Sequence, residues 1–223
     1  MNDHFLELNV EKIDTPLYIT KLNGRDYLSK PFDFHLTVLT DNEQLSADDF
    51  LRKRATITLG GNDQTPQYYN GIIYSAIKNI ITPKKADKSH EFSLAIYPWL
   101  SFLDDDIKNH IYCANHPMTI PEIVASIFKN HGYTDYDMTE IANDHAPLNY
   151  CVQHQETTLN FIHKLLIQAG ISYYFKHTQD KHMLMFNDTG YFQNNQAKEV
   201  IIEENEQHHD HITKWCHMNS LAP

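Results

Sequence analysis

The sequence predicts a mixed α+β fold that is mainly β, with a small β-barrel interrupted by an inserted α+β lobe. Three observations lead to this prediction. Apolar residues alternate with a period of two through most of the first hundred residues, which is typical of half-buried strands. The apolar period becomes helical after residue 118. A weak strand pattern then returns after Gln196, at 199–203 and 211–215, which indicates that the chain leaves the barrel and comes back.

Six candidate strands lie in the first hundred residues, at 5–10, 17–22, 32–40, 54–59, 68–80 and 90–97. Gly71 lies inside one of them, and a glycine within a strand marks a bulge, a corner or a close approach of two backbones. Short strands at regular spacing, separated by polar turns, predict a small barrel or sandwich.

The stretch LNGRDYLSKPFDFHL, at 22–36, connects two of these strands. Asn23 and Gly24 favour the positive backbone angles of a type I′ turn. Pro31 breaks the pattern before the long strand that starts at Phe32. The stretch is therefore interpreted as a turn that fixes the register of that strand.

Two helices are predicted in the second half of the chain. Thr119 and Glu122 form a capping box with Pro121 in the first turn, and Gly132 ends the helix. The second helix begins near Thr157 and ends before Gly170. Two strands follow at 171–177 and 182–188, joined as a hairpin around 178–181.

These patterns predict the domain organisation. A discontinuous β-barrel domain is expected at 1–112 and 196–218, an inserted α+β lobe at 113–195, and a short tail at 219–223.

Composition restricts the function. The chain has 223 residues and a net charge of −11, which argues against nucleic acid as a partner because phosphate binding requires clustered Lys and Arg. Three widely spaced cysteines without a C-x-x-C pair indicate a reduced, cytoplasmic protein. The opening segment MNDHFLELNV lacks the features of a secretory signal, and no apolar run is long enough to insert into a membrane. Export would therefore need another machine.

Candidate chemistry is sparse. On a strand, His209 and His211 would share one face and could bind a metal, although a solvated histidine-rich loop is the alternative interpretation. The acidic run 104–106 lacks the glycine and terminal glutamate of a calcium loop and is interpreted as a charged turn. Cys151 with a histidine could form a nucleophile and base, but a buried structural cysteine is the alternative. With no catalytic or phosphate-binding motif, we predict no catalytic residue and no cofactor.

The order of several motifs resembles a known family. GRDYLSKPFDFHLTVLT is similar to the segment near the start of VgrG proteins, the spike proteins of type VI secretion systems; Asp26 stands where that family usually has glutamate. Further similarities follow in the family's order: YYNGIIY, SLAIYPWLSFL, MTIPEIVASIFKNHGY, NYCVQHQETTLNFIHKLLIQAGISYYFKH and ITKWCHMNSLAP. The resemblance covers nearly the whole chain.

The resemblance implies a non-enzymatic hub fragment of a spike that assembles on the inner tube and helps to deliver effectors. It implies a homotrimer for the full-length protein, with the inner-tube ring and effectors or adaptors as partners. It also implies a location in the bacterial cytoplasm before firing and export afterwards. The family continues with a second barrel, which this sequence does not reach, so a fragment or a truncated gene is expected. A contractile phage tail hub is the related alternative, and a metal-dependent effector that uses His209 and His211 is the alternative from another class.

Individual roles follow from this interpretation. Asp26 and Ser29 are expected to satisfy backbone groups in a bend, not to bind a substrate. Exposed aromatics beside the lobe, such as Tyr173 and Tyr191, are candidate interface residues.

Overall fold

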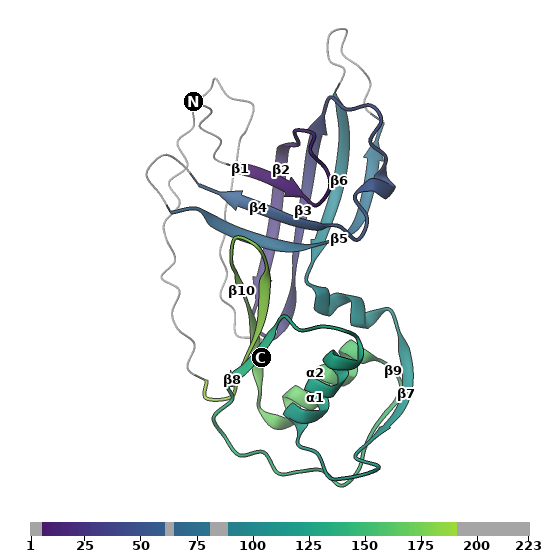
Figure 1. Cartoon of the computed structure of the whole chain (residues 1–223), viewed down its shortest axis with the longest axis vertical. Coiled ribbons are helices and arrows are strands. Elements are labelled where there is room, and N and C mark those ends of the chain that lie inside the picture. The colour runs from purple at the N-terminus through teal and green to yellow at the C-terminus, as the bar shows by residue number, and fades with distance from the viewer. Residues whose placement is uncertain (1–5, 61–64, 81–88, 191–223) are drawn as a thin grey trace.

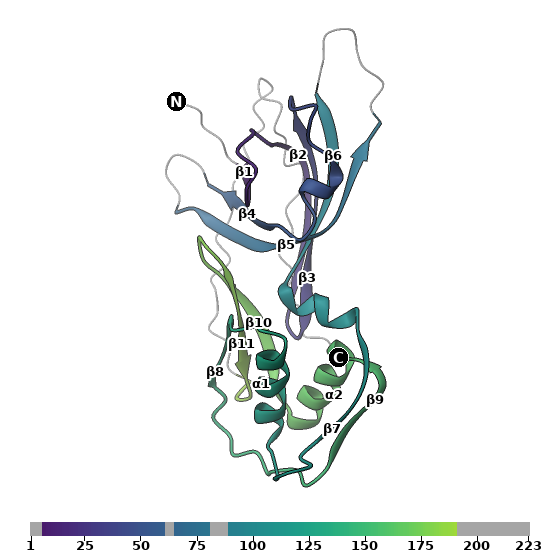
Figure 2. The same cartoon turned by 45° about the vertical axis from the view of Figure 1, so that its right-hand side comes forward.

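A curled antiparallel sheet and a smaller part that contains two helices stack along the long axis of the molecule (Figure 1). The structure, a computed structural model, describes residues 6–60, 65–80 and 89–190. Seen from the side, the long strands of the sheet extend down to the helical part (Figure 2).

The sheet has six strands in the order β1-β4-β5-β6-β3-β2, and all neighbouring pairs are antiparallel. Its strands are β1 (Leu6–Val10), β2 (Tyr18–Tyr27), β3 (Lys30–Thr40), β4 (Arg54–Leu59), β5 (Gln67–Asn79) and β6 (His90–Tyr97). The mixed, mainly β fold class is thus confirmed, with a sheet curled like half a barrel. Closure of this sheet by 196–218 lies outside the described residues and stays a prediction.

Alternation places the core on one face of the sheet. In β3, Phe32, Phe34 and Leu36 are all buried, while the residues between them are more exposed. In β4, Ala55 and Ile57 are buried in the same way. Because successive side chains on a strand point to opposite faces, this pattern fixes which face of the sheet carries the core.

The predicted turn at Asn23–Gly24 is wrong, because β2 runs through both residues in register with β3. The hairpin turns five residues later, between Tyr27 and Lys30, where Ser29 has a positive φ of 57°. Glycine is needed at 24 for a different reason: a Cβ there would lie 2.4 Å from Cδ1 of Phe34. The hairpin therefore uses Gly24 to admit an aromatic ring, not to reverse the chain.

The helical part contains both predicted helices, α1 (Ile120–Asn130) and α2 (Thr158–Ala169). The capping box of α1 is confirmed, since Glu122 accepts the Thr119 backbone N–H at 2.7 Å and Thr119 Oγ1 accepts the Glu122 backbone N–H at 3.3 Å. Gly170 ends α2 in the left-handed conformation.

Small sheets accompany the helices. β10 (Ser172–His177) and β11 (His182–Asn187) form the predicted hairpin, and β8 (Tyr136–Glu140) pairs with β11 in parallel. β7 (Ile107–Tyr112) and β9 (Cys151–Thr157) form a two-stranded ribbon. Two short 3₁₀ helices, η1 (Ala47–Asp49) and η2 (Trp99–Asp104), complete the described elements.

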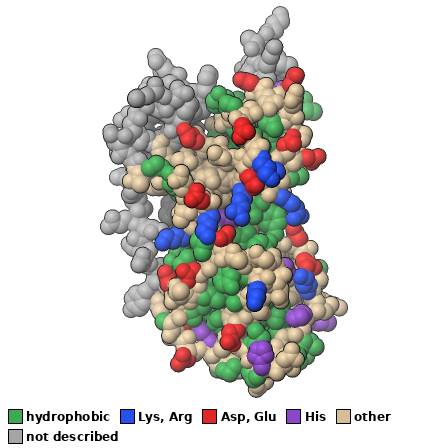
Figure 3. Space-filling model, viewed as in Figure 1, with side chains coloured by type: hydrophobic (Ala, Val, Ile, Leu, Met, Phe, Trp, Pro, Cys, Tyr) green, Lys and Arg blue, Asp and Glu red, His purple; other side chains and the backbone are tan. Residues whose placement is uncertain are grey.

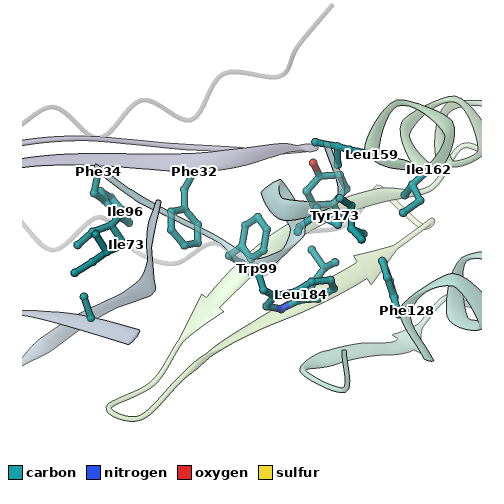
Figure 4. Close-up of a cluster of buried hydrophobic side chains, with 14 of the residues drawn as sticks. Phe32, Phe34, Ile73, Ile96, Trp99, Phe128, Leu159, Ile162, Tyr173 and Leu184 are labelled. Carbon is teal, nitrogen blue, oxygen red and sulfur yellow. The ribbon is translucent and has the colours of Figure 1, made fainter. Parts of the chain in front are cut away.

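One continuous apolar core joins the two parts. Figure 4 shows Phe34 and Phe32 at the sheet end, Trp99 and Tyr173 in the middle, and Ile162 at the helix end. All five side chains are buried. The hairpin β10–β11 lies between the sheet and the helices, so its position determines how the two parts meet.

None of the helices in the described part of the chain is long and apolar enough to span a membrane.

Candidate functional site

The tip of the β10–β11 hairpin docks on the sheet through two histidines. His177 and His182 face each other at the ends of the two strands. Both meet Asn70 of β5, which is only 4% exposed. The Asn70 backbone N–H donates to Nδ1 of His177 at 2.9 Å. On its other side, the Asn70 main chain makes a hydrogen bond with the imidazole of His182.

Further hydrogen bonds complete this junction. The Asn70 side-chain NH₂ donates to Thr56 Oγ1 at 3.0 Å and to the Gln179 carbonyl at 3.2 Å. The Trp99 backbone N–H donates to Nε2 of His182 at 3.3 Å. The hairpin tip is therefore bonded to β5 and to the start of η2, and Asn70 is itself bonded to β4.

The junction histidines are neutral at pH 7. Burial lowers the pKa of His177 to about 3, and repulsion from His182 adds to this effect. Burial also lowers the pKa of His182 to about 4, although nearby Asp135 acts in the opposite direction. The ring of His177 packs against those of Phe32 and Tyr69, with centroids 5.0 and 5.5 Å away.

A cleft of about 130 Å³ lies beside the junction. It is lined by Arg54, Ala55, Thr56, Asn70, Gly71, Ile72, Trp99, Gly132, Tyr133, Thr134, Asp135, Asp180, Lys181 and His182. Figure 3 shows Lys and Arg side chains across the middle of this face, at the height where the two parts meet. The cleft has room for roughly four water molecules, so it suits solvent or a very small polar group and not a macromolecule.

The metal and calcium candidates gain no support from the structure. His209 and His211 lie outside the described residues. Within the ranges that are described, no group of three His, Cys, Asp or Glu side chains is arranged to hold a metal ion. The run 104–106 lies at the end of η2, where each carboxylate has a protein partner: Asp104 accepts from Thr157, Asp105 from Tyr74, and Asp106 pairs with Lys108.

Cys151 is unsuited to nucleophilic catalysis. Burial raises the pKa of its thiol, and neighbouring Cys113 raises it further. A raised pKa keeps the thiol protonated at pH 7, whereas the reactive form is the thiolate. Both cysteines are free, and Cys113 is the buried one of the two.

Asp26 and Ser29 have structural contacts, in line with the interpretation from the sequence. The Tyr27 backbone N–H bonds to the Asp26 carboxyl, and burial of that carboxyl raises its pKa to about 6. The Ser29 backbone N–H donates to the Tyr173 carbonyl at 2.8 Å, and Ser29 Oγ accepts the Tyr173 backbone N–H at 3.3 Å. Ser29 thereby joins the β2–β3 turn to the hairpin.

The choice of Tyr173 as an exposed interface residue is wrong. Its side chain is 1% exposed, and its hydroxyl lies 2.8 Å from Nε2 of His163. The alternation of β10 directs this ring toward the buried face of the strand, on the side of α2. The sequence alone did not show which face of β10 is buried. Tyr191 lies outside the described residues.

The structure reveals a different aromatic surface, formed by Tyr74, Tyr97, Phe102 and Arg52, which we name the aromatic patch. Tyr74 is 44% exposed, and its ring lies 5.4 Å from those of both Tyr97 and Phe102. The Arg52 guanidinium lies 5.7 Å from the Phe102 ring. Tyrosine and arginine are enriched at protein interfaces, so the patch is a candidate contact surface.

Sequence reasoning missed the aromatic patch because its residues come from separate elements. A register shift in β5 between Ile73 and Ser75 accompanies the exposure of Tyr74. A bulge of this kind changes the direction of a side chain, and the local alternation of apolar residues does not predict where a bulge occurs.

Comparison with known proteins identifies the family. Residues 25–223 match the sequence profile of the phage tail baseplate hub (GPD) family. The chain belongs to this family. The predicted resemblance to the spike proteins is likewise confirmed by the relatives and structures that follow.

Several hub-family relatives are spike proteins of type VI secretion systems. VgrG1b of Pseudomonas aeruginosa is 26% identical over 182 residues, which cover 79% of this chain and 24% of that protein. VgrG3 of Vibrio cholerae is 27% identical over 199 residues, which cover 84% of this chain and 18% of that protein. The chain thus spans about a quarter or less of the length of these relatives.

Solved structures share the hub fold. The E. coli c3393 protein is described as a component of the type VI secretion system with structural similarity to the T4 bacteriophage tail proteins gp27 and gp5. It superposes with a TM-score of 0.73 at 18% identity, over 84% of this chain and 51% of that chain. The Francisella PdpA–VgrG complex in its half-lidded form superposes with a TM-score of 0.59 at 12% identity, over 82% of this chain and 31% of that chain.

Proposed function

We propose that this chain is a structural hub region of a type VI secretion spike, which assembles on the inner tube and helps to deliver effectors without catalysing a reaction. The family match over residues 25–223 carries the proposal, and the spike proteins among the relatives direct it to secretion. The junction agrees with such a role, because its histidines are bonded to the main chain of other elements and hold two parts of the fold together.

The domain organisation is proposed as predicted from the sequence: a barrel at 1–112 and 196–218, a lobe at 113–195 and a tail at 219–223. The open edges β1 and β2 of the described sheet support it, because an additional strand could pair there. The pairing of β7 with β9 joins residues 107–112 to the strand before α2, so it favours a lobe that starts near 107 instead of 113.

The proposed partners are other copies of this chain, the inner-tube ring and effectors or adaptors. A head-to-tail interface that closes into a ring would build a homotrimer in the full-length protein. A relative's structure is a complex of VgrG with PdpA, which supports a partner of the effector or adaptor type. The proposed location is the bacterial cytoplasm before firing, followed by export with the machine.

The first test is the absolute mass of the chain in solution, from light scattering behind a sizing column over a range of concentrations. A trimer would mean that this region encodes the three-fold axis. A monomer at every concentration would place the axis in parts of the spike beyond this region.

The second test asks whether the aromatic patch contacts a partner. Tyr74→Ser and Phe102→Ser, introduced together, should reduce co-purification of the chain with the inner-tube protein or with other copies of the chain. Tyr150→Ser is the matched control, because Tyr150 is 70% exposed and has no ring contact with the patch. Equal recovery of all partners with both variants would remove the patch from the proposal.

A hub of a contractile phage tail is the second candidate function, since the family is named for it and the E. coli protein resembles phage tail proteins. Selective binding to a secretion tube protein or to a phage tail tube protein would separate the two. The family and its relatives give no support to the metal-dependent enzyme.

A further inference from the structure

The two junction histidines share an uncommon bonding role: each accepts a hydrogen bond from a backbone N–H of another element. His177 accepts through Nδ1 from Asn70, and His182 accepts through Nε2 from Trp99. An imidazole nitrogen accepts only while it carries no proton. These bonds therefore require both rings to be neutral, and they fix opposite tautomers, with the proton on Nε2 of His177 and on Nδ1 of His182.

Protonation of either ring would place an N–H against an N–H. Nε2 of His177 is already buried without a hydrogen-bond partner among the described residues, so the ring has no second bond to offset the loss of the first. His182 is held from both sides, between the Trp99 N–H and the Asn70 main chain. A proton added to His177 breaks a bond that joins the hairpin to β5, and a proton added to His182 breaks one that joins it to η2.

The groups around His177 do not stabilise its protonated form. His177 faces Phe32 and Phe34 of β3, Tyr69 of β5 and His182 of β11, none of which supplies a carboxylate. Burial raises the pKa of the nearby Tyr69 hydroxyl, and the Asp26 carboxyl of β2 raises it further.

Around His182, the carboxylate of Asp135 is already paired with Lys181 at 2.8 Å. Arg54 of β4 adds a positive charge on the same ring. Each histidine would also repel the other if both were protonated. Around His182, Asp135 and the Asn70 main chain favour the protonated ring, whereas burial, the largest effect, and Arg54 favour the neutral one.

We propose that His177 and His182 form a proton-sensitive latch, which holds the tip of the hairpin on the sheet at neutral pH and releases it on acidification. Release would free residues 177–182 and open the adjoining cleft, which Asn70, Trp99 and His182 line. The other end of the hairpin would stay attached, because the Ser29–Tyr173 backbone contact uses no titratable group. The movement is thus an opening of the tip about a fixed base.

The size of the effect follows from linkage. A released histidine regains its ordinary proton affinity, so acidification to pH 5 shifts the ratio of closed to open latch by about thirtyfold for each ring. The rings are only 6.0 Å apart, so their contributions are coupled and the combined effect is smaller than the product.

The first experiment uses the unaltered chain. Nitrogen-15 chemical shifts of the imidazoles at pH 7 should give the opposite tautomers stated above. Both rings should resist protonation down to about pH 5. Matching tautomers, or ordinary titration of both junction rings, would overturn the latch.

The second experiment measures amide exchange at Asn70 and Trp99, corrected for the intrinsic effect of pH. Between pH 7 and pH 5, protection of these two amides should fall at least tenfold more than that of Leu94 in β6. In the double variant His177→Gln and His182→Gln, each carboxamide oxygen can accept the same bond without titrating, so this difference should disappear. His154→Gln is the control and should behave like the unaltered chain.

Two results would overturn the proposal in this experiment. A parallel loss of protection at Leu94 would mean that the histidines stabilise the whole fold and do not act as a local latch. Unchanged protection at Asn70 and Trp99 in the unaltered chain would mean that no release occurs. Because this last measurement needs no substitution, the proposal stays testable even if the double variant fails to fold.

Discussion

The six-stranded sheet and the junction beneath it are built by different means. The sheet is held by antiparallel pairing between strands whose apolar residues alternate, so the sequence of each strand specifies which of its faces is buried. The junction is held by single polar groups from distant positions, such as Asn70 and His177, which are 107 residues apart. The difference teaches that regular elements are encoded locally, whereas their docking depends on a few residues that no local pattern marks.

Phe32→Ala should have the largest effect, because this ring belongs to both regions. It is fully buried and its centroid lies 4.9 Å from Phe34, 5.0 Å from Phe175 and 5.4 Å from His182. Loss of such a ring costs about 4 kcal/mol in the free energy of unfolding. Urea unfolding should show one transition by far-ultraviolet circular dichroism and by tryptophan emission.

Leu51→Ala is the control for that variant, because Leu51 is 37% exposed and should change stability by less than about 1 kcal/mol. Two separate transitions in the Phe32 variant would contradict the view of a single core shared by both regions.

Gly71→Ala tests the sheet alone. A Cβ at this position would lie 2.3 Å from Cγ2 of Ile96 and 3.0 Å from the carbonyl oxygen of Tyr97. Overpacking against a neighbouring strand costs about 3 kcal/mol, so the thermal midpoint should fall by several degrees. Gly60→Ala is the matched control, since its nearest neighbour, Pro66, is 3.4 Å away. A midpoint equal to that of the control would mean that β5 and β6 separate easily.

Asp26→Asn tests the electrostatic cost near the junction. Burial raises the pKa of this carboxyl from 3.8 to about 6, so the native state binds a proton more tightly than the unfolded chain. The carboxyl therefore favours folding fully below pH 3.8, and this contribution is lost as the pH rises to about 6. The variant should be more stable than the parent by about 2 kcal/mol at pH 7, with little gain at pH 4.

Urea unfolding at both pH values checks this prediction, with exposed Asp48→Asn as the control. The two latch histidines act with the opposite sign. Their lowered pKa values make the unfolded chain the better proton acceptor, so their contribution is complete above pH 6.5 and declines toward about pH 4. Equal gains at pH 4 and pH 7 for Asp26→Asn would show that the carboxyl is well solvated.

Thr119→Ala should have the smallest effect, because it removes a local feature of the helical part. The substitution deletes the oxygen that accepts the Glu122 N–H, which should cost about 1 kcal/mol. Thr119→Ser keeps that oxygen and should stay close to the parent in thermal unfolding. If both substitutions reduced stability equally, the threonine methyl group and not the cap would be the important feature.

Sequence predicted the regular elements better than their connections. The bounds of β4 and β6 were predicted to the residue, because uninterrupted alternation specifies a strand and its buried face. The turn at Asn23–Gly24 was mispredicted because Asn-Gly is a strong turn signal, while the close approach of the Phe34 ring is a tertiary effect. β8 escaped notice because its short, half-exposed sequence YDMTE has little apolar pattern.

The candidate site was less predictable than the fold. Histidines 177 and 182 were recognised as strand residues at a hairpin, but their burial depends on Phe32 and Asn70 of other strands. The aromatic patch depends on a bulge in β5, which only the observed register reveals. Physical pattern located the elements, and the resemblance to a family supplied the function.

The bond between Ser29 and Tyr173 spans 144 positions of the chain, and this separation bears on how the protein is made. During synthesis, β2 and β3 leave the ribosome long before β10, so Ser29 at the end of their hairpin has no Tyr173 to bond with until β10 emerges. In that interval Phe32 lacks the cover of Phe175 and His182. Distant contacts slow folding and leave apolar surface exposed, so a nascent chain of this kind is prone to aggregation until β11 has emerged.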